Sequence, residues 1–111
     1  MDRNRSGDRL SLTSPQNLQR LADAVRSAGM TPLSVALKTF STLTDDAVLF
    51  TARLKFICPC GRALEQLVTE AYWRDGSCGR TFDWAFERML AWIGRDLASH
   101  VEREIASGEI A

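Results

Sequence analysis

Three cysteines and one histidine are the residues of this chain best suited to bind a metal or act as nucleophile and base. Cys60 and Cys78 are each followed by a glycine, as in the knuckles of zinc ribbons. Structural zinc, however, takes four N or S ligands, usually in two pairs separated by about two to four residues. Cys58-Pro-Cys60 lacks that spacing, and His100 stands far from Cys78 along the chain. We therefore expect structural thiols and no metal. A zinc-stabilised module around the three cysteines is a third interpretation, after the two that are described at the end of this section.

The same cysteines bear on the compartment. Their number is odd, and Cys58 and Cys60 stand too close together for an ordinary disulfide framework, which predicts reduced thiols. The first ten residues, MDRNRSGDRL, carry no apolar segment of the kind that a secretory signal needs. No apolar run approaches the roughly 20 residues of a membrane span. We expect a cytoplasmic protein.

Catalysis finds little support in the sequence. A nucleophile–base pair would have to come from Cys60 or Cys78 with His100, and no motif around them would orient such a pair. The glycines at 61, 76 and 79 do not have the arrangement of a phosphate-binding loop. We expect a protein that is not an enzyme and uses no cofactor.

The composition predicts one folded domain. The chain has 111 residues, 45% of them hydrophobic and 25% charged, which suits a single core. Residues 1–14 are expected to form a mobile arm, residues 15–107 the domain, and residues 108–111 a frayed tail. Lys and Arg balance Asp and Glu at 14 each, so nucleic-acid binding is disfavoured.

Start and stop signals predict an α-rich α+β domain with about four helices and one strand. Ser14-Pro15 is a helix-opening pair, and Gly29 suits a helix end. Thr81 caps a long C-terminal helix whose apolar residues fall at helical spacing. The expected helices cover residues 15–28, 31–42, 60–74 and about 81–106.

Residues 47–57 are the exception, because apolar and polar side chains alternate there with the period of a half-buried strand. A lone strand leaves backbone groups unpaired. We expect it to pair either with the segment Leu10–Thr13 or with the same strand of a second subunit. The second possibility predicts a homodimer.

A helix-turn-helix is the runner-up interpretation. Leu21 to Val35 has a glycine at the expected turn, which would make Met30–Phe40 the recognition region of a small DNA-binding regulator. That region is apolar, with Lys38 as its only charge, so it offers few donors to base edges.

A protein-binding surface is the favoured interpretation. Trp84 lies on the long helix away from the stripe that contains Phe86 and Ile93. A tryptophan flanked by arginines has the composition of an interface hot spot. Truncating Trp84 is therefore expected to weaken binding and leave the fold intact. The candidate contact residues are Trp84, Arg88, Trp92 and Arg95, together with Leu33, Leu37 and Phe40.

The polar arm, the helical character and the tryptophan-bearing stretch from Phe82 to Ile93 resemble the small bacterial quorum-sensing antiactivators. The likeness is one of size and character across the chain. It implies a protein that binds a LuxR-type transcription activator and blocks its dimerisation or its DNA binding. It implies no catalytic residues, because such proteins act by occupying a surface.

Overall fold

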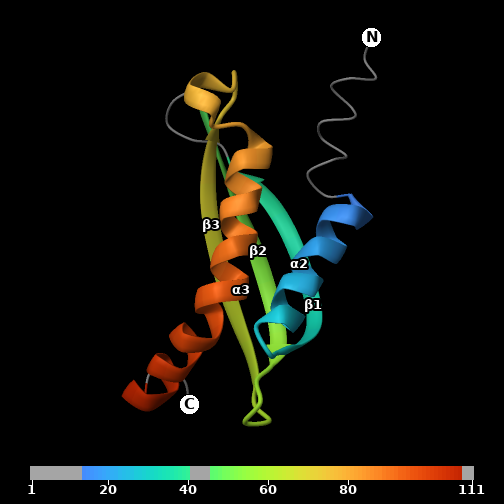
Figure 1. The fold of residues 1–111 in the computed structure, drawn as a ribbon, viewed down its shortest axis with the longest axis vertical. Helices are drawn as coiled ribbons and strands as arrows, with labels where there is room; N and C mark the ends of the chain where they lie inside the picture. Colours follow the sequence, from blue (N-terminus) through green and yellow to red (C-terminus); the bar gives the residue numbers. More distant parts are fainter. Residues whose placement is uncertain (1–13, 41–45, 109–111) are drawn as a thin grey trace.

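The computed structural model describes residues 14–40 and 46–108 as a mixed α+β fold. An N-terminal helix is followed by three strands, a short 3-10 turn and a long helix (Figure 1). In chain order the elements are α2 (Pro15–Ser27), β1 (Thr31–Phe40), β2 (Ala47–Ile57), β3 (Ala63–Trp73), η1 (Ser77–Gly79) and α3 (Phe82–Ser107).

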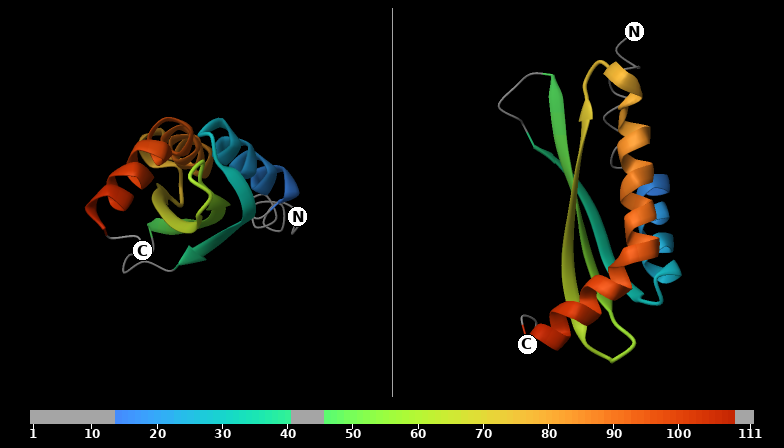
Figure 2. Two further views of the ribbon diagram at one scale, coloured as in Figure 1. Left: turned by 90° about the horizontal axis from the view of Figure 1, so that it is seen from below. Right: turned by 60° about the vertical axis from the view of Figure 1, so that its left-hand side comes forward.

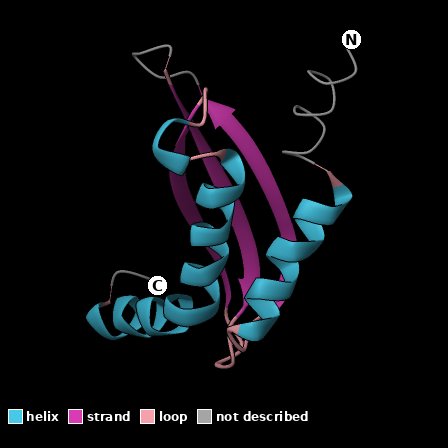
Figure 3. Ribbon diagram, turned by 45° about the horizontal axis from the view of Figure 1, so that its top comes forward, coloured by secondary structure: helices cyan, strands magenta, loops and turns pink. Residues whose placement is uncertain are grey.

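The strands form an antiparallel sheet in the order β1-β2-β3, with β2 in the centre. The β2–β3 register is regular, whereas β1 has an irregularity between Pro32 and Ser34. Both helices cover the same face of the sheet, α2 over β1 and α3 over β3 (Figure 2). The opposite face carries no helix in the part of the chain that the structure describes (Figure 3).

The core lies between the sheet and the two helices. β2 supplies its floor, because every second side chain from Val48 to Phe56 is buried against the helices. Leu21 and Val25 of α2 enter the core from above β1. The α3 stripe completes it with Ala85, Phe86, Met89, Ile93, Leu97 and Val101.

The two helices begin where the sequence predicts. The Ser14 side chain accepts a hydrogen bond from the backbone N–H of Asn17, and Pro15 occupies the first turn, where its missing N–H costs nothing. The Thr81 side chain accepts from the N–H of Trp84 at 3.2 Å in the same way. Arg20 of α2 pairs with Glu87 of α3 and lies 5.3 Å from the ring of Phe86, so the helices are also tied to each other.

The four-helix prediction is wrong, since two of the expected helices are strands. Residues 31–40 form β1, with Val35 half-buried and Leu37 buried on the covered face. The irregularity after Pro32 interrupts the alternation of inward and outward side chains in β1. The apolar residues of this segment are therefore spaced in a way that also fits a helix. Because Met30–Phe40 contains no helix, the structure also overturns the helix-turn-helix interpretation.

Residues 63–73 form β3 in place of the helix predicted over 60–74. The helical pattern rested on Leu64, Leu67, Val68, Ala71 and Tyr72. In the strand these residues divide between the two faces. Leu64, Val68 and Tyr72 pair opposite buried residues of β2, whereas Leu67 pairs opposite the exposed Arg53. The apolar positions of this segment therefore fit a helix with 3.6 residues per turn as well as a strand with apolar residues on both faces.

The strand predicted over residues 47–57 is present with those bounds as β2. Its partners differ from the expectation, because β1 and β3 of the same chain flank it on both sides. No second subunit is needed to satisfy its backbone. The segment Leu10–Thr13 lies outside the described residues.

Candidate interaction surface on the uncovered face of the sheet

The uncovered face of the sheet is built by the residues that alternate with the core positions of each strand. Cross-strand pairing arranges them in rows: Ala36, Arg53 and Leu67 form one, and Lys38, Thr51 and Thr69 the next. All six residues are exposed except Thr51, which is half-buried. The term open face is used below for this set: Ser34, Ala36, Lys38, Leu49, Thr51, Arg53, Lys55, Glu65, Leu67 and Thr69.

Two polar contacts order the centre of the open face. Arg53 of β2 pairs with Glu65 of β3 across one diagonal. The hydroxyls of Thr51 and Thr69 lie 2.8 Å apart, in hydrogen-bond contact. The hydrogen bond from Arg53 holds the pKa of Glu65 below its ordinary value of 4.5, and the charges of Arg53 and Lys55 act in the same direction. Glu65 is therefore a carboxylate at neutral pH.

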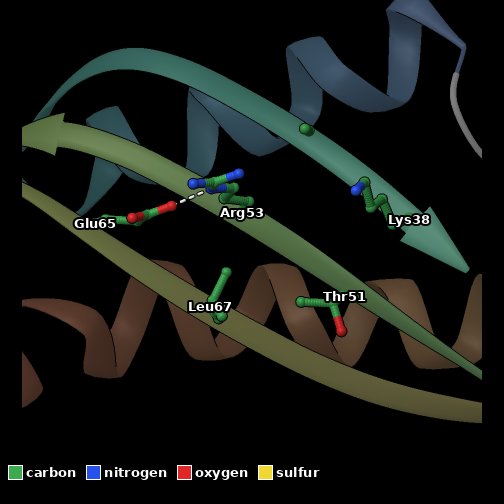
Figure 4. Close-up of a pocket in the computed structure, with 6 residues that line it drawn as sticks. Lys38, Thr51, Arg53, Glu65 and Leu67 are labelled. Atoms are coloured by element: carbon green, nitrogen blue, oxygen red, sulfur yellow. Dashed lines mark hydrogen bonds and ion pairs between the residues drawn. The ribbon is translucent and has the colours of Figure 1, made fainter. Parts of the chain in front are cut away.

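The same face contains an open hollow of about 500 Å³. Ala36 and Lys38 line it from β1, Thr51 and Arg53 from β2, and Glu65 and Leu67 from β3. Figure 4 looks onto this hollow, with both helices behind the sheet and the Arg53–Glu65 pair beside it.

Exposed leucines distinguish this face from an ordinary solvated one. An antiparallel sheet often turns one face to water, and that face is then polar. Here Leu67 is 57% exposed and Leu49 38% exposed. Three cations, Lys38, Arg53 and Lys55, share the face with a single carboxylate, that of Glu65. Exposed apolar side chains with positive charges on the two neighbouring strands suit a protein partner that carries acidic groups.

The contact residues predicted on α3 fall into two groups. Trp84 is half-buried and packs on the core, with the guanidinium groups of Arg80 and Arg88 at 5.2 and 5.1 Å from its ring. Arg88 also pairs with Glu70 of β3 at 3.6 Å. The indole of Trp84 is thus partly covered within the chain.

Trp92 and Arg95 lie further along α3. Trp92 is half-buried and makes an edge-to-face contact with His100, whose Nε2 lies 2.9 Å from a carboxylate oxygen of Glu104. Arg95 is exposed and pairs with its neighbour Asp96. These residues and the Trp84 group occupy the helix side of the molecule, away from the open face.

The β1 residues proposed for contact are not equivalent. Leu33 is 56% exposed, so it is available to a partner. Leu37 is 6% exposed and pairs opposite the buried Ala52, which makes it a core residue, contrary to the prediction. Phe40 ends β1, and its side chain lies outside the described structure.

The cysteines also differ from expectation. Cys58 and Cys60 are joined by a disulfide in the β2–β3 turn, contrary to the prediction of reduced thiols. Cys78 is a free, exposed thiol within η1. Within residues 14–40 and 46–108, no group of three His, Cys, Asp or Glu side chains is placed to hold a metal ion.

Most open-face residues escaped the sequence interpretation. Arg53, Glu65 and Leu67 belong to no sequence motif. Because a helix was predicted over residues 60–74, there was no reason to place these three residues on one face of a sheet. Lys38 stands out in the sequence only as a charge in the expected recognition region. The sequence of β3 has no period of two that could have found them, because Gln66 and Glu70 occupy positions on the covered face and Leu67 a position on the open face.

Comparison with known proteins adds no assignment. No family model matches the chain, and neither a curated protein nor a solved structure matches it. Among the described residues, neither helix has the length and apolar character to cross a membrane. The function is therefore inferred from the chain's own surface.

Proposed function

We propose that this protein is a non-enzymatic regulator that binds another protein through the open face. The exposure of Leu67 on the uncovered face, midway along the edge strand β3, is the observation that carries the proposal. Fully burying a leucine side chain contributes about 1.5–3 kcal/mol. Contact with a partner would gain the part of this free energy that belongs to the exposed surface of Leu67. We assign no catalytic role and no cofactor to any residue.

The surrounding charges support a partner with acidic groups. Lys38 and Lys55 stand on either side of the Arg53–Glu65 pair, and a partner with acidic residues around an apolar patch would complement them. The resemblance to quorum-sensing antiactivators makes a LuxR-type transcription activator the proposed partner, held so that its dimerisation or DNA binding is blocked. Nucleic acid is not proposed, because the net charge of the chain is zero.

A charge placed at Leu67 on the open face tests this function. Leu67→Glu should weaken binding to the activator by about 30-fold or more, the size of a hot-spot loss. Isothermal titration calorimetry with the purified activator measures the affinity. Ala91→Glu is the matched control, because it adds the same charge at an exposed position of α3. Circular dichroism of both variants checks that the fold is kept.

The α3 side of the molecule supplies the opposing outcome. If Ala91→Glu and Arg95→Glu weaken binding while Leu67→Glu does not, the contact lies on the helix surface around Trp92. If the activator does not bind the unaltered chain, the proposed partner is wrong.

A further inference from the structure

The turn between β2 and β3 places two cysteines side by side at the tip of a hairpin. Cys58 and Cys60 flank Pro59, and the Cα atoms of the two cysteines lie 5.3 Å apart, within the range that a disulfide spans. The bond joins residues only two positions apart, so it closes a very small loop. A cross-link of that size removes little chain entropy from the unfolded state, which argues against a mainly structural purpose.

The backbone of the turn is held independently of the sulfurs. The N–H of Gly61 donates to the carbonyl of Cys58 at 2.8 Å, and the N–H of Cys58 donates to the carbonyl of Arg62 at 2.9 Å. Gly61 has φ +92°, a conformation that glycine adopts without strain. Regular pairing of Ile57 with Ala63 continues the hairpin directly below. These backbone contacts hold the Cα atoms of the two cysteines in place without any contribution from the disulfide.

The two sulfurs have different surroundings. Cys58 is 4% exposed and belongs to the core, whereas Cys60 is exposed at the tip. Cys60 is therefore the more accessible of the two cysteines to an incoming thiolate. A reduced Cys58 remains a small apolar side chain that the core accommodates.

We propose that Cys58 and Cys60 form a redox-active pair that exchanges its disulfide with a dithiol substrate, with Cys60 as the sulfur that is attacked. A substrate thiolate forms a bond to Cys60 Sγ while the Cys58–Cys60 bond breaks, and its electron pair leaves on Cys58 Sγ, which takes a proton. The second substrate thiol then attacks the substrate sulfur of the mixed disulfide and releases Cys60. The chain gains two electrons and two protons, and the dithiol becomes a disulfide. A second disulfide, such as oxidised glutathione, reverses the exchange.

The experiment uses the full chain with Cys78→Ser, so that only the pair contributes thiols. The protein is equilibrated in buffers with different ratios of reduced to oxidised dithiothreitol, alkylated, and weighed by mass spectrometry. We expect reversible uptake of two alkyl groups, with the same circular dichroism in both states. A bond that fails to form in oxidising buffer, or that opens only in denaturant, would overturn the proposal.

Single variants in that background test the asymmetry. Cys58→Ser leaves Cys60 free, and this thiol should form a mixed disulfide with oxidised glutathione. Cys60→Ser leaves Cys58, which should react at least about tenfold more slowly because it is buried. Equal rates in two variants that both stay folded would assign no special role to Cys60. Thermal melts establish the folding of each variant.

Discussion

At the scale of single residues, Trp84 and Phe86 show how two neighbouring aromatic side chains of one helix differ. Phe86 is 1% exposed and stacks with Phe82 inside the core. Trp84 is half-buried, and part of its ring faces two arginines. The helical spacing in the sequence indicates that the two side chains point in different directions from α3. Only the packing shows that Trp84 already has partners within the chain.

Substitution should therefore affect the two residues unequally. Phe86→Ala is expected to lower the free energy of unfolding by about 3–5 kcal/mol, because it removes a fully buried ring and leaves a cavity. Trp84→Ala should lower it by about 1–2 kcal/mol, because the indole is only partly buried and its cation–π pairs lie at an exposed site. Urea unfolding followed by circular dichroism measures both. Equal effects would make Trp84 a full core residue.

The Arg53–Glu65 pair predicts a dependence on pH. The pKa of Glu65 is lower in the folded chain than its ordinary value of 4.5, so this carboxylate favours the folded state above that pH. The contribution falls as the pH drops below about 4.5 and is lost once Glu65 is protonated in the folded chain as well. Stability measured by urea unfolding should therefore fall less between pH 6 and pH 3 in Glu65→Gln than in the unaltered chain.

The control for this effect is Glu102→Gln, which removes an exposed acid from α3, far from the open face. It should follow the pH profile of the unaltered chain more closely than Glu65→Gln does. A Glu65 carboxyl resonance that titrates at or above its ordinary pKa in NMR would contradict the assigned interaction with Arg53.

At the scale of elements, α3 depends on a defined start. The Thr81 hydroxyl satisfies the N–H of Trp84, one of the backbone donors that a helix leaves unpaired at its first turn. Asp83 adds a negative charge where the helix dipole is positive. This first turn stands beside the end of β3, since the N–H of Trp73 donates to the carbonyl of Arg80 at 2.8 Å.

Removing the cap should weaken the whole domain, because α3 supplies a full stripe of core residues. Thr81→Ala is expected to lower the free energy of unfolding by about 1 kcal/mol. Thr81→Ser keeps the hydroxyl and should retain most of the stability. Urea unfolding compares the three proteins, and an unchanged midpoint in Thr81→Ala would show that the cap contributes nothing measurable.

At the scale of the whole molecule, the sheet has two long edges. β1 and β3 each pair on one side only, with β2, among the described strands. Unpaired strand edges offer backbone donors and acceptors to another chain. β2 (residues 47–57) is paired on both sides, so it gives no reason to expect a dimer. The free edges of β1 and β3 give a different reason to expect one.

We therefore predict a homodimer formed through a strand edge. Size-exclusion chromatography with light scattering should give twice the chain mass of 12.4 kDa at micromolar concentration. A single-chain mass at all concentrations would contradict the prediction. Arg53→Glu changes a residue of the central strand β2, away from both edges, and should leave the dimer mass unchanged.

Local signals determined several features of this protein from the sequence alone. Ser14 with Pro15 and Thr81 with Asp83 set the starts of the helices, because capping and dipole effects act within a single turn. The period of two over residues 47–57 identified β2 for the same reason: its alternation is complete within the segment.

Tertiary structure decided the rest. Residues 31–40 and 63–73 carry apolar positions compatible with either a helix or a strand, and pairing on both sides of β2 selects the strand. That choice turns Leu67 from a member of a helical stripe into an exposed residue of the open face. The turn at Pro59 likewise brings Cys58 and Cys60 into a bond that their spacing had argued against. Strand pairing and the disulfide both depend on the geometry of the folded backbone. The pattern along the sequence therefore left both outcomes open.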